Sequence, residues 1–292
     1  MNNKFFIILI SFSLLSLASC EDELKTLEPF TEVDPQSFLT SEASFQIAVN
    51  GVYTQLFNYY AESADGLQGI PDILSDNVIQ VQSGRTSNNA YYDYIFAANT
   101  LGAIERYWSE CYEAINGANI IISVIDNLPN GEGKDNILGQ TLAARGWAHF
   151  DLARIYAQIP TQSGDANSSL GVIYVAEEDG DTGDPFVTPA RELVSENYTE
   201  IIEDLETASQ LIGADNGEGR LNRDGVFGLL SRVYLYNGEY QKAIDAANEV
   251  TIAIATSEEL AGVYTDSNSA GIVVELAVNT TSEATFETVG VL

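Results

Sequence analysis

Few side chains in this sequence could carry out catalytic or metal chemistry. The chain has one histidine, His149, and two cysteines, Cys20 and Cys111. These are too few soft ligands for a zinc or iron–sulfur site and too few thiols for a disulfide framework. His149 lies on an apolar helical pattern, and Cys111 lies between Trp108 and Tyr112, so we predict a structural histidine and a small core residue. A catalytic Cys111 would need the lone His149 as its base. The sequence therefore predicts no catalytic residue, no metal and no cofactor.

One acidic loop keeps a metal alternative open. Asp179, Asp181 and Asp184 are spaced like the first acids of an EF-hand calcium loop. Gly183 precedes Asp184, which inverts the order that the motif requires, and no glutamate stands at the twelfth position. Calcium binding near Asp179–Asp184 is left open.

A second polar stretch, from Asp76 to Phe96, has the composition of a sugar-binding loop. Flat aromatic rings stack on the apolar faces of sugars, and carboxylate, amide and guanidinium groups bond their hydroxyls. The stretch lies within a long break in the helical pattern, from Glu62 to Asn99. A loop of that length inside a compact domain is typically functional or disordered, and we interpret it as functional. Packing of Tyr91, Tyr94 and Phe96 against the core is the alternative. The candidate ligand-binding residues of this stretch are Asp76, Asn77, Arg85, Asn88, Tyr91, Tyr92 and Tyr94.

The charge of the chain excludes one class of partner. The 292 residues include 43 acidic and 12 basic side chains, for a formal net charge of −31. Binding to nucleic acid depends on Lys and Arg that neutralise phosphates, so no nucleic-acid partner is expected. The hydrophobic content of 45% is high enough to form a core in one or two domains.

The N-terminus has the pattern of an export signal. Its apolar run, Phe5–Ala18, is shorter than the roughly 20 residues that span a bilayer. The run ends in Leu17-Ala18-Ser19-Cys20, the spacing of a bacterial lipobox, whose cysteine is lipidated after cleavage. We therefore predict a lipoprotein signal peptide at 1–19, a lipidated Cys20 that holds the chain to a membrane, and an acidic tether at 20–40. An ordinary signal peptide is the alternative.

Helical periodicity dominates the rest of the chain, and the expected helical domain is 41–270. Apolar residues recur at spacings of three and four, and Pro and Gly interrupt the pattern. Short strand-like runs occur at 171–176 and 271–278. The expected helices are 41–59, 103–127, 136–159, 188–212 and two within 226–254 that flank Asn237-Gly238-Glu239.

The last two helices match the tetratricopeptide pattern. Leu230, Ser231 and Tyr234 occupy the places of its first helix, and Ala243 and Ala247 those of its second. Leu152, Ala153 and Tyr156 repeat the first half, and the helix containing 198–208 is their expected partner. The predicted fold class is all-α, a tetratricopeptide-like α-α superhelical scaffold with long inserted loops.

Four blocks follow one another behind the lipobox: Ala114–Ile120, Ala144–Pro160, Ile202–Ala208 and Gly219–Tyr236. Together they resemble the SusD/RagB family of outer-membrane nutrient-binding lipoproteins. The resemblance implies a non-catalytic protein that captures glycans, or peptides in some members, and acts as a lid on a TonB-dependent, SusC-like barrel transporter. It implies that Asp76 to Trp108 forms the N-terminal part of the ligand site, which adds Trp108 to the candidates. It also implies an apparently truncated chain, with a strand and tail at 271–292 where the family's C-terminal half is missing.

Three functions are compatible with the sequence. The resemblance favours a lipid-anchored, surface-exposed outer-membrane protein that delivers oligosaccharide to the transporter. A scaffold whose tetratricopeptide-like helices bind a protein and no small ligand is the second reading. An enzyme, most plausibly a glycoside hydrolase, is third, because no pair among the 43 acids stands out as catalytic.

Overall fold

The computed structural model describes residues 35–61, 70–75, 77, 79, 89–95, 102–176, 189–217, 219–263, 265 and 269–276. The chain divides into two units, Met1–Phe38 and Leu39–Leu292. In the first unit the described element is a short helix, α3 (Pro35–Phe38). The predicted signal peptide, the lipobox and Cys20 lie outside the described residues.

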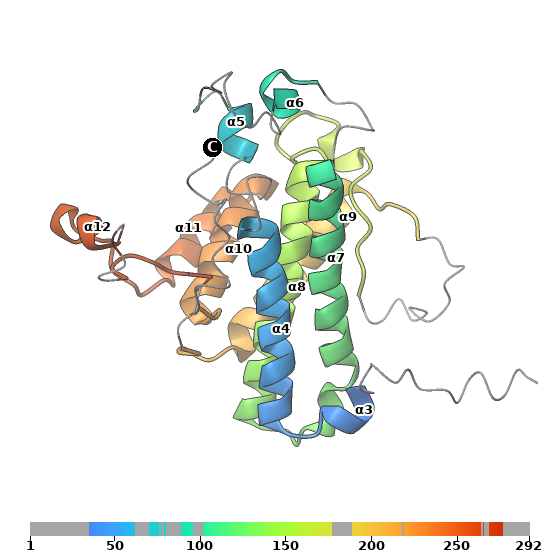
Figure 1. The fold of residues 1–292 in the computed structure, drawn as a ribbon, viewed down its shortest axis with the longest axis vertical. Coiled ribbons are helices and arrows are strands. Elements are labelled where there is room, and N and C mark those ends of the chain that lie inside the picture. Colours follow the sequence, from blue (N-terminus) through green and yellow to red (C-terminus); the bar gives the residue numbers. More distant parts are fainter. Residues whose placement is uncertain are drawn as a thin grey trace, which may run out of the picture. The chain divides into compact units, whose positions relative to one another are not determined.

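The second unit is built from helices joined by loops (Figure 1). Its described part contains no strand, only one isolated antiparallel bridge between Leu170 and Leu193. The prediction of an all-α fold is confirmed. The elements are α4 (Glu42–Ala61), α5 (Ile70–Leu74), α6 (Asn89–Tyr92), α7 (Gly102–Ser123), η1 (Ile125–Asn127), α8 (Glu132–Tyr156), η2 (Ala166–Ser168), α9 (Val194–Leu211), α10 (Arg223–Asn237), α11 (Tyr240–Asn248) and α12 (Ser257–Val263).

Helix α8 is the centre of the packing. Nearly every residue from Ile137 to Ala153 is buried, which is typical of a helix covered on all sides. Helices α4, α7 and α9 pack against it. Small residues permit the close approach to α9: the Cα of Gly146 faces Leu205, and Gly139 faces the backbone of Ile212. The predicted pairing of this helix with the segment 198–208 is confirmed.

Three predicted helix ends, two of α8 and one of α9, are wrong. Helix α8 begins at Glu132 rather than Asn136 and ends at Tyr156, short of Ile159. Helix α9 begins at Val194 rather than 188, because Glu192 hydrogen-bonds to Gly171 and Val172 and so is held outside the helix. The Glu196 carboxylate then accepts the Leu193 N–H at 2.8 Å and caps the helix start.

The two strand-like runs do not form strands in the part that is described. Apart from the bonds of Gly171 and Val172 to the Glu192 backbone, the segment 171–176 is held by side chains. Asn197 Oδ1 accepts from Val172 N at 2.6 Å, and the Tyr112 hydroxyl donates to Ile173 O at 2.7 Å. In 271–276, Val274 and Leu276 are half-buried against the core. Both runs are apolar because they cover helices, not because they pair in a sheet.

The hairpin of α10 and α11 confirms the tetratricopeptide-like pair but corrects one residue. Gly238 adopts a φ of 81°, which turns the chain between the two helices. The Ser231 hydroxyl of α10 donates a hydrogen bond to Ala243 O of α11 at 2.9 Å. Ala243 is buried as predicted. The second buried alanine of α11 is Ala246 and not the predicted Ala247, which is exposed. At 100° per residue, the face of α11 against α10 is centred between 243 and 246, which turns 247 toward solvent.

This register predicts different outcomes for two identical substitutions. Ala243→Leu is expected to cost about 1–3 kcal/mol by overpacking, which lowers the Tm by roughly 2–4 °C for each kcal/mol. Ala247→Leu on the exposed face is expected to leave the Tm nearly unchanged. Thermal unfolding followed by circular dichroism measures both, and equal decreases would refute the register.

Candidate functional site

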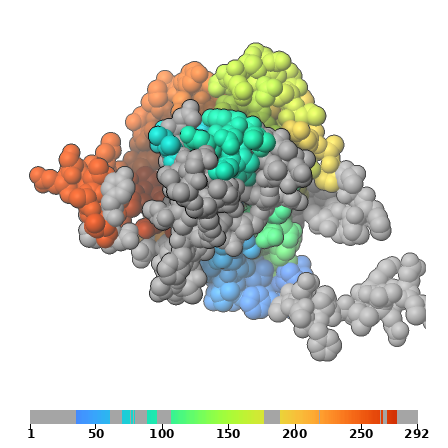
Figure 2. Space-filling view, turned by 45° about the horizontal axis from the view of Figure 1, so that its top comes forward, coloured from blue at the N-terminus to red at the C-terminus, as the bar shows by residue number. Residues whose placement is uncertain are grey.

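The described part of the polar loop predicted to bind ligand includes α6 and lies at one end of the helices. Figure 1 shows α5 and α6 at the end where α4 finishes, α7 begins and α8 finishes. Figure 2 turns this end forward and shows atoms of α5 and α6 at the surface. The described candidates of α6, and Trp108 near the start of α7, are therefore at the same end of the scaffold.

The structure describes part of the predicted site. Asp76, Arg85 and Asn88 lie outside the described residues, as does Asp179–Asp184. Asn77 is exposed, and its side-chain amide donates to Asp72 Oδ1 at 3.2 Å. Of the four aromatic candidates, Tyr91 is buried, Tyr92 and Trp108 are half-buried, and Tyr94 is 52% exposed.

Tyr94 links the two short helices. Its hydroxyl donates to Leu74 O at the end of α5. Its backbone φ is 53°, a left-handed conformation that is uncommon for a residue other than glycine. The hydroxyl is therefore engaged while about half of the side chain faces solvent.

Beneath α6, aromatic side chains of α7 and α8 pack together. The Trp108 ring lies edge-on to Tyr156 at a centroid distance of 4.8 Å and 5.0 Å from Tyr112. Burial raises the pKa of Tyr156. The structure thus brings Trp108, Tyr112 and Tyr156 together, and buried Tyr91 lies in α6 at the same end of the helices. Sequence reasoning missed Tyr156 as a site neighbour because it was assigned to the tetratricopeptide pattern alone.

A buried carboxylate holds the next layer of aromatics. Asp151 is 1% exposed, accepts hydrogen bonds from Tyr60 at 2.5 Å and Tyr59 at 3.3 Å, and is ion-paired with Arg154. The Trp147 indole donates to the Tyr60 hydroxyl at 2.9 Å. Burial and Asp151 raise the pKa of Tyr60, so this tyrosine stays a neutral donor. The cluster can position its rings rigidly.

The two residues with catalytic potential are buried. Cys111 has no exposed surface, and burial together with Asp151 raises the pKa of its thiol well above the usual value. A neutral, inaccessible thiol is a poor nucleophile, in agreement with the predicted core role. His149 is also fully buried, and burial and Arg145 lower its pKa to about 3. It is therefore the structural histidine that the sequence predicted.

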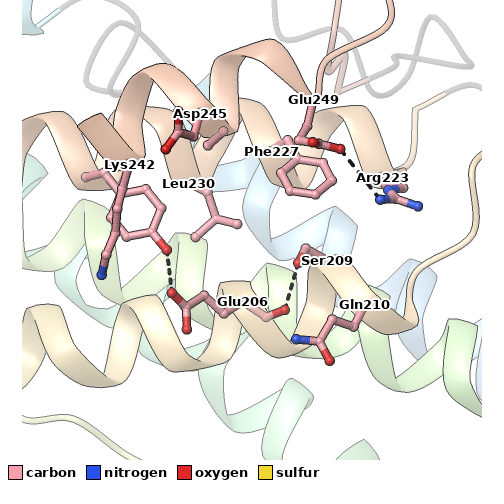
Figure 3. Close-up of a pocket in the computed structure, with 11 residues that line it drawn as sticks. Glu206, Ser209, Gln210, Arg223, Phe227, Leu230, Lys242, Asp245 and Glu249 are labelled. Carbon is pink, nitrogen blue, oxygen red and sulfur yellow. Dashed lines mark hydrogen bonds and ion pairs between the residues drawn. The ribbon is translucent and has the colours of Figure 1, made fainter. Parts of the chain in front are cut away.

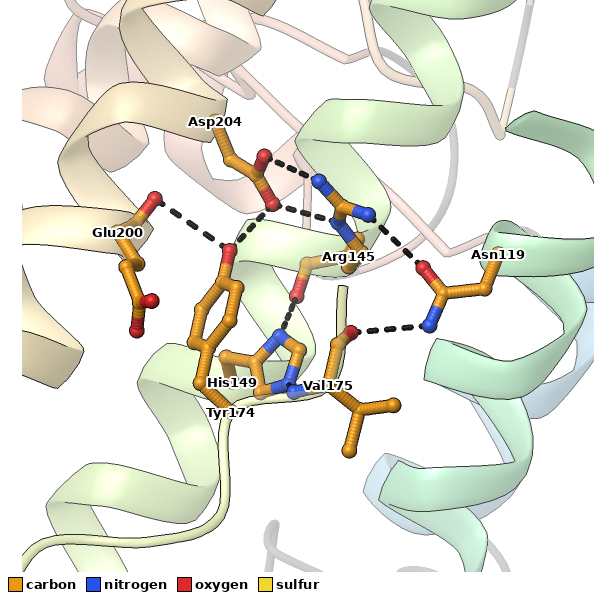
Figure 4. A network of polar contacts seen from close by, with 7 residues as sticks. All are labelled: Asn119, Arg145, His149, Tyr174, Val175, Glu200 and Asp204. Carbon is orange, nitrogen blue, oxygen red and sulfur yellow. Dashed lines mark hydrogen bonds and ion pairs between the residues drawn. The ribbon is translucent and has the colours of Figure 1, made fainter. Parts of the chain in front are cut away.

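His149 belongs to a polar network that ties three helices to the segment 172–176 (Figure 4). Its Nε2 accepts the Val175 N–H at 3.1 Å, so Nδ1 carries the proton and donates to Arg145 O at 3.1 Å. The ring stacks on Tyr174 with centroids 3.9 Å apart. Asn119 of α7 completes the attachment by donating to Val175 O at 2.9 Å.

Arg145 and Asp204 form the centre of this network. Arg145 Nε and Nη2 donate to the two carboxylate oxygens of Asp204 at 2.8 and 2.7 Å, and Nη1 donates to Asn119 Oδ1 at 2.8 Å. The Tyr174 hydroxyl adds a 2.6 Å bond to Asp204. Burial opposes the charge of Arg145, but the bonds and charge of Asp204 raise its pKa overall. The network fixes α7, α8 and α9 relative to one another.

Two other observations bear on the class of site. Within the described residues, no group of three His, Cys, Asp or Glu side chains is placed to hold a metal ion. None of the helices that could be searched is long and apolar enough to cross a membrane.

Comparison with known proteins identifies the family. Residues 29–235 match the SusD-like family described as "starch-binding associating with outer membrane". SusD-like protein P2 of Formosa agariphila is 24% identical over 268 residues, which cover 89% of this chain and 49% of that protein. The chain therefore spans about half the length of this relative.

Solved structures agree with this match. A candidate sugar-binding protein of Bacteroides vulgatus is 31% identical, with a TM-score of 0.66 over 84% of this chain and 56% of its own. A laminarin-binding SusD-like protein is 19% identical, with a TM-score of 0.60 over 79% of this chain and 50% of its own. These relations and the helical fold lead to one conclusion: the chain belongs to the SusD-like family.

Proposed function

We propose that this chain belongs to a non-catalytic, glycan-binding lipoprotein of the outer membrane. The family description supports starch-like ligands and association with the outer membrane, and one structural neighbour is described as binding laminarin. Cys20 in the lipobox would carry the lipid anchor. A SusC-like TonB-dependent barrel transporter would receive the oligosaccharide.

The observation that carries the proposal is the aromatic surface at the α5–α6 end. Tyr94 is half-exposed, and Trp108 and Tyr92 are half-buried, so each has ring surface that solvent can reach. The rings beneath them, Tyr156 and Tyr112, hold Trp108 in a fixed orientation. A rigid ring loses little conformational entropy when a sugar stacks on it.

The buried state of the potential catalytic groups supports a binding role over hydrolysis. Cys111 and His149 have no access to a substrate. Asp151, which lies behind the aromatic layer, is already bonded to three side chains. We infer that the chain holds its ligand without changing it.

The proposal predicts glycan binding that depends on Tyr94. The mature chain is expected to bind laminarihexaose or maltohexaose in isothermal titration calorimetry. Tyr94→Ala is expected to weaken binding up to about tenfold, because an aromatic contact contributes about 0.5–1.5 kcal/mol.

Matched controls separate the ring from its hydroxyl and its position. Tyr94→Phe keeps the ring and loses the bond to Leu74 O, so it should bind nearly as the parent does. Tyr240→Ala removes a tyrosine that is 59% exposed on α11 and should have no effect. Absence of heat with every glycan would contradict the proposal, and release of shorter sugars would indicate a glycoside hydrolase.

A further inference from the structure

A groove lies on the outer side of α10, away from the residues assigned to the candidate site. Its volume is about 450 Å³, within the size range of pockets for small ligands. Helix α10 forms the floor, α9 forms one wall and α11 the other (Figure 3). No residue of α5, α6 or α7 lines it. We call it the α10 groove.

The floor of the α10 groove is apolar and the walls are polar. Phe227 and Leu230 provide the apolar surface, together with Ala246 from α11. Glu206 and Gln210 project from α9, and Asp245 from α11 lies across from them (Figure 3). An apolar strip between facing hydrogen-bonding groups matches a pyranose, which has an apolar face and a rim of hydroxyls.

The cations of the groove are already engaged. Lys242 is ion-paired with Glu239 at 2.5 Å and lies over the Tyr234 ring at 5.1 Å. Arg223 lies 3.8 Å from Glu249 and over the Phe227 ring at 5.3 Å. These contacts place the two cations at opposite ends of the floor helix. They leave no free cationic cluster for a phosphate or another anion.

The walls keep unused hydrogen-bonding capacity. Glu206 accepts the Tyr234 hydroxyl through Oε1 at 2.5 Å, and Asp245 accepts Gln241 through Oδ1 at 2.9 Å. In each case the second carboxylate oxygen has no partner among the described residues. The Gln210 amide likewise has no partner in the described part of the chain and can both donate and accept. Acceptors and donors therefore face each other across an apolar floor.

We propose that the α10 groove is a second saccharide-contact site that takes one or two units of a neutral oligosaccharide. The sugar lies on Phe227 and Leu230, its hydroxyls donate to Glu206 and Asp245, and Gln210 bonds a further hydroxyl. The inference rests on the proposed function for the class of ligand. The α10 groove is a different site from the one at the α5–α6 end, because none of the predicted ligand-binding residues lines the groove.

Methyl and indole NMR signals of the full chain test the two sites separately. The Leu230 and Ala246 methyl groups report the α10 groove, and the Trp108 indole reports the α5–α6 end. On titration with maltohexaose or laminarihexaose, the Leu230 and Ala246 signals are expected to shift and saturate. In the double variant Gln210→Ala/Asp245→Ala, the Kd from these signals should rise at least about fivefold while the Trp108 response stays unchanged.

Asn248→Ala is the matched control, since Asn248 is exposed on α11 and does not line the groove. Gln210 and Asp245 are also exposed, so their loss should not unfold the chain, and the Tm checks this. The inference would be overturned if the Leu230 and Ala246 signals did not move at saturating sugar. It would also be overturned if the Kd from these signals were the same in the double variant as in the parent. A shift of the Trp108 signal alone would support the proposed function and contradict the second site. A shift of the Leu230 and Ala246 signals alone would support the α10 groove as a saccharide site and contradict the site at the α5–α6 end.

Discussion

Asp204→Ala is expected to lower the free energy of unfolding by about 3–5 kcal/mol, because it leaves a buried guanidinium without its counter-charge. The side chains of Arg145 and Asp204 are each only 9% exposed, so water cannot replace the lost bonds. Tyr174 would lose its acceptor as well. Urea unfolding followed by circular dichroism measures the loss, with the Cm decreasing and the m value retained.

Two variants show whether the buried charge is the cause. Glu249→Ala breaks an exposed pair with Arg223, whose atoms are 3.8 Å apart, and should cost less than about 1 kcal/mol. The double variant Arg145→Met/Asp204→Leu removes both charges and should recover much of the loss. If the double variant were as unstable as Asp204→Ala, the uncompensated charge would not be the reason for the instability.

The second large effect is expected from His149 as the pH falls. Its pKa is about 3 in the folded chain, against about 6.5 for an unperturbed histidine. Between these values the unfolded state binds more protons than the folded state, so acid favours unfolding. The contribution of His149 is complete above pH 6.5 and is lost at up to about 1.4 kcal/mol per pH unit as the pH falls toward 3.

The groups around His149 explain the direction. Arg145 contributes a positive charge on the same helix, and Tyr174 and Tyr112 are neutral rings against the imidazole. Protonation of Nε2 would also remove the acceptor of the Val175 N–H. Among the described residues no carboxylate is bonded to the imidazole, so none of its described partners compensates an added proton.

A comparison with His149→Gln isolates this contribution from that of the many carboxylates. At pH 7 the variant should be less stable than the parent, because it loses the stacking on Tyr174 and the fitted hydrogen bonds. The difference in unfolding free energy should shrink as the pH decreases from 6.5 to 4. Parallel stability curves over this range would show that His149 does not titrate as the structure implies.

Most helices could be predicted from the sequence because their signals are local. Apolar residues at spacings of three and four marked α4, α7 and α10, and Asn237-Gly238-Glu239 marked the turn before α11. Gly238 confirms that turn with its positive φ. The assignment of His149 and Cys111 to the core followed from their apolar neighbours in the same helices, and the structure confirms it.

The site was only partly accessible to this reasoning. Composition pointed to the tyrosine-rich loop, but it could not separate buried Tyr91 from half-exposed Tyr94, which lie within one turn. Nothing in the sequence pattern marked Asp151 or Tyr156 as part of a site, because their roles there depend on partners in α4 and α7. The α10 groove was equally hidden, since its walls come from two helices that are separated in sequence by the floor.

The sequence by itself determined the helices, the tetratricopeptide-like hairpin and the resemblance to the family, because propensity, turn chemistry and motif spacing are properties of short segments. The tertiary structure alone decided that Ala246 rather than Ala247 packs on α10, that 171–176 is held by side chains instead of a sheet, and that Arg145 meets Asp204. Each of these outcomes depends on how segments far apart in the chain approach each other. Periodicity shows which face of a helix is apolar, but only packing shows what covers that face and at which angle.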